Sequence, residues 1–101
     1  MSLPTSCFEI VHLAFLDDVP LARQIELMKL LGDWVATQGG YISRQSYHDR
    51  QSKRWTDVVE WSSLPEAQAA MTASQQEPRL AAVMGAIAPE PLLMGHYERL
   101  V

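Results

Sequence analysis

Aromatic and β-branched residues are interspersed with charged residues along residues 54–61, and the spacing of apolar residues becomes helical directly after them. One set of alternating positions in this segment holds two tryptophans, a valine and Asp57, a composition typical of a half-buried strand. Ser63 is followed three residues later by Glu66, which is the spacing of a capping box at a helix start. The pattern therefore predicts a strand followed at once by a helix that begins near residue 64.

The rest of the chain supplies three further strands and one further helix. Apolar residues at helical spacing predict the first helix, for which Asp17 and Asp18 offer an N-cap and Gly39-Gly40 a C-terminal stop. Pro78 is expected to break or kink the second helix, because proline lacks the backbone N–H that a helix interior needs. The predicted strands are 7–16, 41–48, 54–61 and 92–101, and the predicted helices are 21–38 and 64–87.

This order of elements predicts a ferredoxin-like βαββαβ fold of the α+β class, with a four-stranded antiparallel sheet. We expect residues 1–6 to form an N-terminal arm and residues 7–101 a single domain. Both alternating sets of the first strand are mainly apolar, so this strand needs cover on both faces. Since both helices fall on one face, a second copy of the sheet is the simplest cover for the other, which predicts a homodimer.

Composition narrows the functional classes. Hydrophobic residues make up 48% of the chain and charged residues 20%, as in ordinary globular proteins. The formal net charge is −4 and no basic face is visible, so we expect no nucleic-acid partner. Cys7 is the only cysteine, and the apolar run that follows it contains Glu9 and His12. We therefore expect a cytoplasmic protein with no metal site, no signal peptide and no membrane span.

Two of the three histidines lie in the middle of predicted neighbouring strands, His12 in the first and His96 in the last. If both point to one face they can act as general bases, because the pKa of imidazole is near neutral. Asp57 is a candidate to orient one of them, because a carboxylate flanked by indoles must be paired or hydrated. The alternative is that both histidines are satisfied core or interface residues. Contact between His12 and Asp57 depends on strand register, which the sequence leaves open.

Five further residues are candidates for binding a small aromatic or apolar ligand. Tryptophans stack on aromatic rings, although buried tryptophans are more often part of a core. The tyrosines are possible hydroxyl donors, and the arginine is a possible anion clamp or a salt-bridge partner across strands. The candidates are Trp34, Trp61, Tyr47, Tyr97 and Arg44.

The strand-to-helix corner from Trp55 through Ser63, with the alanine-rich segment 66–71 after it, resembles the dimeric α+β barrel superfamily. Within it the chain looks most like the antibiotic biosynthesis monooxygenase-like domains. The resemblance covers residues 8–100 and rests on element order and the tryptophan-serine corner. It implies a homodimer of two face-to-face sheets, with a pocket between the sheet and helices of each subunit.

Members of this superfamily include cofactor-independent oxygenases that act on polycyclic phenols, haem-degrading enzymes, and proteins without known activity. The haem degraders carry a histidine on the second helix, and residues 64–87 contain none, so we expect no cofactor. The resemblance implies a cofactor-independent monooxygenase for an aromatic or polyketide-like molecule. The strand positions and chemistry described above make His12, His96 and Asp57 the candidate catalytic residues of such an enzyme. The alternative is a non-catalytic homodimeric binding or accessory protein.

Overall fold

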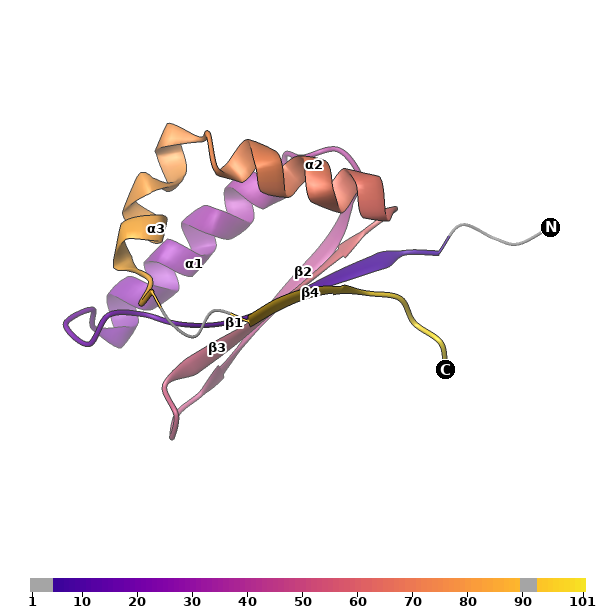
Figure 1. Cartoon of the computed structure of the whole chain (residues 1–101). Coiled ribbons are helices and arrows are strands. Elements are labelled where there is room, and N and C mark those ends of the chain that lie inside the picture. Colours follow the sequence, from indigo (N-terminus) through magenta and orange to yellow (C-terminus); the bar gives the residue numbers. More distant parts are fainter. Residues whose placement is uncertain (1–4, 90–92) are drawn as a thin grey trace.

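The computed structural model describes residues 5–89 and 93–101 (Figure 1). Most of the predicted N-terminal arm, residues 90 and 91 between the second predicted helix and the last predicted strand, and Leu92 therefore lie outside the described residues. The elements, in chain order, are β1 (Cys7–Ala14), α1 (Leu21–Val35), β2 (Tyr41–Asp49), β3 (Arg54–Trp61), α2 (Leu64–Ser74), the 3-10 helix η1 (Pro78–Leu80), α3 (Ala81–Ala86) and β4 (Leu93–Tyr97).

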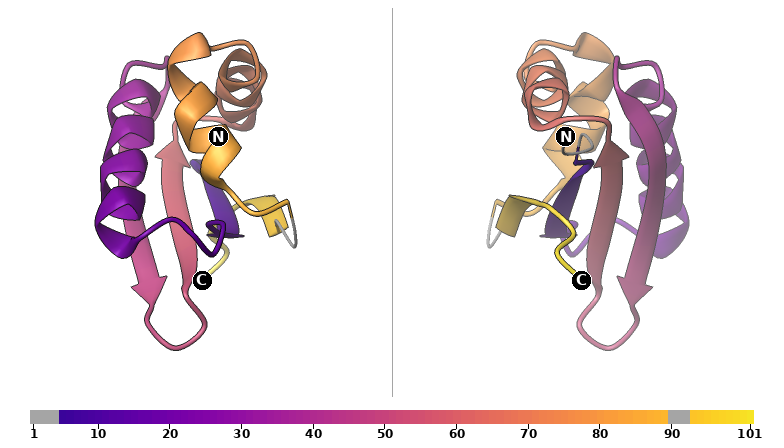
Figure 2. Two further views of the ribbon diagram at one scale, coloured as in Figure 1. Left: turned by 90° about the vertical axis from the view of Figure 1, so that its left-hand side faces the viewer. Right: turned by 90° about the vertical axis from the view of Figure 1, so that its right-hand side faces the viewer.

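The four strands form one antiparallel sheet in the order β2-β3-β1-β4, and the helices lie on one side of it (Figure 1). The predicted ferredoxin-like fold is thus confirmed, with the first strand between the third and the last. β2 and β3 form an antiparallel hairpin, whose turn extends past the helices (Figure 2). No helix in the described part of the chain is long and apolar enough to cross a membrane.

The register of the central strands decides which side chains face the helices. Val11 of β1 lies opposite Asp57 of β3, and His12 lies opposite Thr56. Because side chains alternate between the two faces of a strand, Asp57 faces the helices and His12 faces away from them. The buried residues of β3 on the helix side confirm the predicted alternation: Trp55, Asp57, Val59 and Trp61.

Helix ends agree with the sequence in part. Pro78 interrupts the second helical region as predicted, so that α2 is followed by η1 and α3. The N-cap predicted at Asp17 or Asp18 is wrong. Pro20 occupies this position with φ −68° and ψ 155°, and it makes no side-chain cap. The helix follows directly on the extended backbone of Pro20. Near this end, the side chain of Gln24 donates a hydrogen bond to the carbonyl of Val19.

The predicted capping box of α2 is half formed. The Ser63 hydroxyl accepts a hydrogen bond from the Glu66 backbone N–H at 3.4 Å. The Glu66 carboxylate accepts from the hydroxyl groups of Ser62 and Ser63. Glu66 therefore fastens the end of β3 to the start of α2 through side chains.

Gly40 lies beside this corner and has the positive φ of 85° that glycine tolerates best. A Cβ atom there would overlap the carboxyl group of Glu66. We expect Gly40→Ala to lower the free energy of unfolding by about 1–3 kcal/mol, the usual range for a non-glycine residue held in such a conformation. Urea unfolding of this variant and of Gly39→Ala measures the effect. The nearest atom to a Cβ at Gly39 is 4.0 Å away, so a loss of equal size in both variants would contradict the prediction.

A short backbone ladder connects the end of β1 to the end of α3. Phe15 forms an isolated antiparallel bridge with Ile87. The N–H of Leu16 donates to the carbonyl of Ala86 at 2.9 Å, and the N–H of Ala88 donates to the carbonyl of Ala14 at 2.8 Å. The C-terminal end of α3 is therefore joined directly to the sheet.

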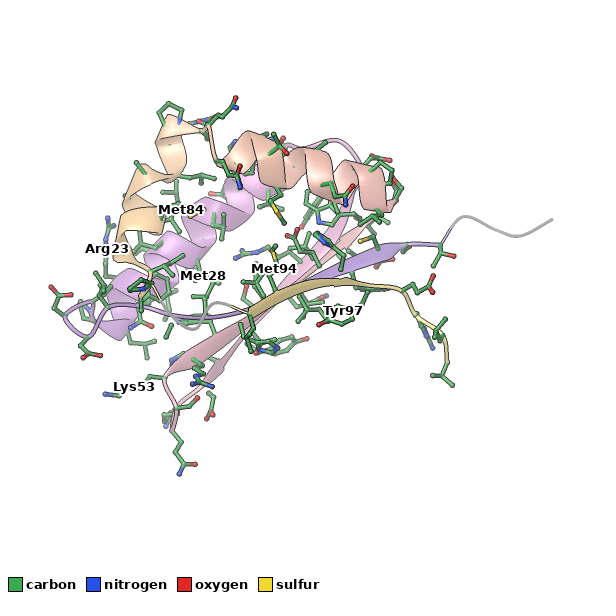
Figure 3. The ribbon with its side chains drawn as sticks, viewed as in Figure 1. Arg23, Met28, Lys53, Met84, Met94 and Tyr97 are labelled. Atoms are coloured by element: carbon green, nitrogen blue, oxygen red, sulfur yellow. The ribbon has the colours of Figure 1, made fainter. Side chains whose placement is uncertain are left out.

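The face of the sheet opposite the helices is partly apolar, and no helix or strand of the described residues covers it (Figure 1). Tyr97 lies on this side of β4, away from the helices (Figure 3). A Cβ atom at Gly95 would lie 2.6 Å from the Tyr97 hydroxyl oxygen, so the absence of a side chain there lets the tyrosine ring lie against the strand. Leu93 on this face is 61% exposed.

Candidate functional site

A cavity of about 710 Å³ lies between the sheet and the three α-helices. Most of its lining is apolar, including Met84 from α3 and Met94 from β4 (Figure 3). Such a cavity, apolar with a few polar groups, is typical of small-molecule sites. The residues that line it are Glu9, Val11, Leu13, Leu31, Trp34, Val35, Asp57, Val59, Trp61, Ala70, Met71, Ser74, Gln75, Gln76, Glu77, Pro78, Leu80, Ala81, Met84 and Met94.

The first polar group of the cavity is a carboxylate–imidazole pair. Glu9 and His96 lie opposite each other on β1 and β4, and the Nε2 atom of His96 is 3.0 Å from Oε2 of Glu9. The side chains are 15% and 18% exposed. Glu9 lines the cavity, whereas His96 does not line it and contacts Glu9 from the edge strand β4. The imidazole therefore contacts Oε2 of Glu9, and Oε1 has no hydrogen-bond partner among the described residues.

Burial raises the pKa of Glu9, and the charge of Asp57 raises it further, while the hydrogen bond and charge of His96 lower it. The net shift is upward, so the folded protein holds this proton more tightly than the unfolded chain does. The stabilisation that follows is fully present below the ordinary pKa of 4.5 and is lost as the pH rises through the raised pKa.

We therefore expect the free energy of unfolding of the natural protein to fall, relative to Glu9→Gln, as the pH rises from the ordinary pKa of 4.5 toward neutrality. Urea unfolding of both proteins across this range measures the difference. Taking the difference removes the contributions of other carboxylates, such as Glu77, whose pKa is lowered chiefly by the hydrogen bond from Arg79. A difference that stays constant or grows with pH would contradict the prediction.

The second polar group is Asp57, which is held from behind by β2. The Ser46 hydroxyl donates to Oδ1 of Asp57 at 2.6 Å, and Nε of Arg44 lies 2.8 Å from the same oxygen. The Arg44 and Asp57 side chains are 10% and 7% exposed. Nη1 of Arg44 donates to the carbonyl of Met28 in α1 at 2.9 Å. Arg44 is thus the salt-bridge partner across strands that the sequence offered as one alternative, and it does not line the cavity.

The predicted catalytic residues are not brought together. His12 lies on the opposite face of the sheet, where Nδ1 is 2.9 Å from the Thr56 hydroxyl oxygen. The contact between His12 and Asp57 is not formed, because the register places Val11 and not His12 opposite Asp57. His12 and His96 also point to different faces, since His96 is opposite Glu9. The catalytic role of His12 stays a prediction, and the cavity is not its location.

Of the predicted ligand-binding residues, the two tryptophans line the cavity and the two tyrosines do not. Trp34 from α1 and Trp61 from the end of β3 are 7% and 1% exposed, so each also belongs to the core. Tyr47 and Tyr97 point to the opposite face and are 60% and 54% exposed. A role for these tyrosines at this cavity therefore has no geometric basis.

Sequence reasoning missed Glu9. The available signal was its position, because it shares one side of β1 with Cys7, Val11 and Leu13, all apolar. A single carboxylate on an apolar strand face must be paired or lie at a cavity. Among residues 5–89 and 93–101, no cluster of three or more His, Cys, Asp or Glu side chains is arranged to hold a metal ion.

Comparison with solved structures finds the same fold in several small bacterial proteins. SnoaB, a cofactor-independent oxygenase from Streptomyces nogalater, superposes with a TM-score of 0.76 at 11% sequence identity, over 98% of this chain and 96% of that chain. A candidate antibiotic biosynthesis monooxygenase from Bordetella bronchiseptica has a TM-score of 0.73 at 16% identity, over 96% of this chain and 99% of that chain.

A candidate antibiotic biosynthesis monooxygenase from Nitrosomonas europaea also matches, with a TM-score of 0.73 at 14% identity over 99% of this chain and 95% of that chain. No protein-family model matches the sequence, and no curated protein matches it. The chain therefore has the fold of the antibiotic biosynthesis monooxygenase-like domains, as the sequence predicted.

Proposed function

From this shared fold, we propose that the protein is a small cofactor-independent monooxygenase that acts on an aromatic or polyketide-like molecule. The observation that carries the proposal is the apolar cavity of about 710 Å³ with the Glu9–His96 pair at its wall. The fold is that of SnoaB, which is described as a cofactor-independent oxygenase. A cavity of this volume has room for a ligand of several fused rings, and Trp34 and Trp61 are among the residues that line it.

Glu9 acts as the general base in this proposal. Its burial raises its pKa and so brings a carboxylate closer to the pH at which proton transfer is efficient. His96 positions the carboxylate through the Nε2–Oε2 contact and leaves Oε1 free to accept the substrate proton. Asp57, which faces the same cavity, binds the substrate at a second point.

Removal of a phenolic proton produces an electron-rich anion that reduces oxygen directly. One oxygen atom enters the ring as a carbonyl group and the other leaves as water, so a phenol and O₂ give a quinone and water. The protein supplies a base and a dry cavity for this reaction. The apolar walls from α1, α2 and α3 exclude water that would stabilise the anion and slow its oxidation.

Oxygen uptake tests the proposal. The purified protein is incubated with a panel of polycyclic phenols in a closed oxygen electrode, after treatment with a metal chelator. We expect uptake with at least one phenol, and a quinone absorbance that rises with it. Absence of uptake across a panel whose members bind to the protein would overturn the proposal.

The alternative is that the protein is a non-catalytic binding or accessory protein with the same fold and cavity. The observation that favours this alternative is that no imidazole lines the cavity among the described residues, since His96 reaches it only through Glu9. In that case polycyclic phenols quench the fluorescence of Trp34 and Trp61 with no oxygen uptake. The two measurements together separate the two functions.

We also propose that the protein is a homodimer whose uncovered sheet faces pack together. Ile10 lies near the centre of this face, opposite Val58 of β3 and Gly95 of β4. Light scattering at micromolar concentration is expected to give the mass of two chains, and Ile10→Glu is expected to give one, because it would bury a charge between the sheets. Gln68→Glu on the exposed side of α2 is the matched control. A monomeric natural protein would contradict the prediction.

A cytoplasmic location is part of the same proposal. It rests on the sequence, in which Cys7 has no partner cysteine for a disulfide bond.

A further inference from the structure

The two carboxylate oxygens of Asp57 have different surroundings: one contacts protein side chains, and the other has none of the described side chains as a hydrogen-bond partner. The Ser46 hydroxyl and the Arg44 guanidinium both contact Oδ1. Oδ2 has no hydrogen-bond partner within the described residues, although the whole residue is only 5% exposed. Since Asp57 lines the cavity, the free oxygen is available to a ligand and to little else.

The carboxylate of Asp57 is held in a fixed orientation. Arg44 lies between β2 and α1, with Nη1 bonded to the Met28 carbonyl. The guanidinium passes so close to Gly32 that a Cβ atom there would overlap Nη1, so α1 fits around it. Fixed hydrogen-bonding groups discriminate between ligands better than mobile ones, because they cannot turn to suit a mismatched group.

Glu9 and Asp57 form two separate acceptor points on one wall of the cavity. Glu9 is opposite Val59, and Asp57 is opposite Val11, so the two carboxylates are diagonal neighbours on β1 and β3. Diagonal pairs of this kind are about 7–8 Å apart, which is comparable to the length of a fused two-ring system. Each uses one oxygen for a protein partner, His96 for Glu9 and Arg44 with Ser46 for Asp57.

The charge of the lining disfavours anions. It includes the carboxylates of Glu9, Asp57 and Glu77, and among the described residues no lysine, arginine or histidine lines the cavity. The Arg44 guanidinium balances the charge of Asp57 from behind, outside the lining of the cavity, and it donates from Nη1 to the Met28 carbonyl, while Nη2 has no hydrogen-bond partner among the described residues. A ligand carboxylate placed beside Asp57 would meet a like charge with no cation to offset it.

We propose that Asp57 is a specificity-determining residue, which accepts a hydrogen bond from a second, uncharged hydroxyl group of the ligand, and that this cavity rejects ligands with an anionic group at that position. The proposal rests on the proposed function for the aromatic ligand whose first hydroxyl group binds Glu9. It adds that a substrate carries a second donor, about two rings away from the first.

Three probes that differ in one group test this assignment. They are a naphthalenediol with one hydroxyl group on each ring, its monomethyl ether, and the naphthol in which a carboxylate replaces the second hydroxyl. Binding is measured without oxygen, by calorimetry, so that it does not depend on turnover. We expect the natural protein to bind the diol at least about tenfold more tightly than the ether, and the carboxylate most weakly, since a hydrogen bond to a charged group contributes that much or more.

The variant Asp57→Asn replaces the free acceptor with an amide that also donates. We expect it to lose the preference for the diol over the ether and to gain affinity for the carboxylate. Glu9→Gln is expected to keep the order of the three probes, because the second substituent does not contact it. If Asp57→Asn does not fold, the ratio of the affinities of the natural protein for the diol and the ether still tests the proposal.

Equal affinity for diol and ether, no binding of the diol, or an unchanged preference in Asp57→Asn would overturn the inference. These results are distinct from failure of the proposed function. Selective binding of the diol without oxygen uptake would contradict the proposed oxygenase function and support the specificity role of Asp57. Oxygen uptake without selective binding would support the oxygenase function and contradict the role of Asp57.

Discussion

Replacement of Arg44 by leucine is expected to lower the free energy of unfolding by about 3–5 kcal/mol, the usual cost of leaving one member of a buried ion pair alone. Arg44 and Asp57 are 10% and 7% exposed at their side chains, so water cannot replace the guanidinium. The Met28 carbonyl also loses its donor from Arg44. Urea unfolding monitored by tryptophan fluorescence measures the change.

Two further variants isolate the cause. The double variant Arg44→Leu/Asp57→Leu removes both charges, and we expect it to recover most of the lost stability, because well-packed apolar residues often replace a buried ion pair without loss. Arg23→Leu removes an arginine from an exposed pair with Glu26, whose side chains are 52% and 66% exposed. That change is expected to stay within about 0.5 kcal/mol. If the double variant is no more stable than Arg44→Leu, the loss does not come from the isolated charge of Asp57.

Glu9→Gln is expected to lower the rate of oxygen uptake by about 100- to 10,000-fold, the range for loss of a general base. The amide keeps the size of the side chain and removes its ability to accept a proton. His96→Gln is expected to lower the rate less, because the carboxylate remains and only its position and proton affinity change. Initial rates with the best phenol of the panel measure both effects.

The variant Asp33→Asn is the control for this series, because it makes the same change of carboxylate to amide on the exposed side of α1. His12→Gln tests the assignment drawn from sequence against the one drawn from geometry. Loss of turnover in His12→Gln, together with normal turnover in Glu9→Gln, would contradict the Glu9 mechanism and restore the sequence-based one.

Local patterns in the sequence were enough to predict the elements and the faces of the third strand. Alternation placed Trp55, Asp57, Val59 and Trp61 together, and all four are buried on the helix side. Pro78 marked the break between α2 and η1 because its effect on a helix is local and strong. These features depend on residues that are neighbours in sequence.

The pairing of β1 with β3 depended on information that the sequence did not carry. β1 is apolar on both faces, so neither register is excluded by hydrophobic burial, and a slip of one residue would have brought His12 beside Asp57. The observed register instead pairs Val11 with Asp57 and turns Glu9 to the cavity. The site was therefore predicted in part: Asp57, Trp34 and Trp61 line the cavity, and the histidine that contacts a carboxylate is His96, with Glu9 as its partner.

Because of the backbone ladder between β1 and α3, the helical side of the molecule is joined to the sheet by backbone hydrogen bonds at one end and, within the described residues, not at the other. Residues 14–16 and 86–88 are joined by backbone hydrogen bonds that cross from sheet to helix, whereas Gln76 and Glu77, at the other end, donate only to carbonyls of the preceding turn in Ala73 and Ser74. Thermal widening of the cavity is therefore expected to begin beside Pro78, with Ala86 as the pivot.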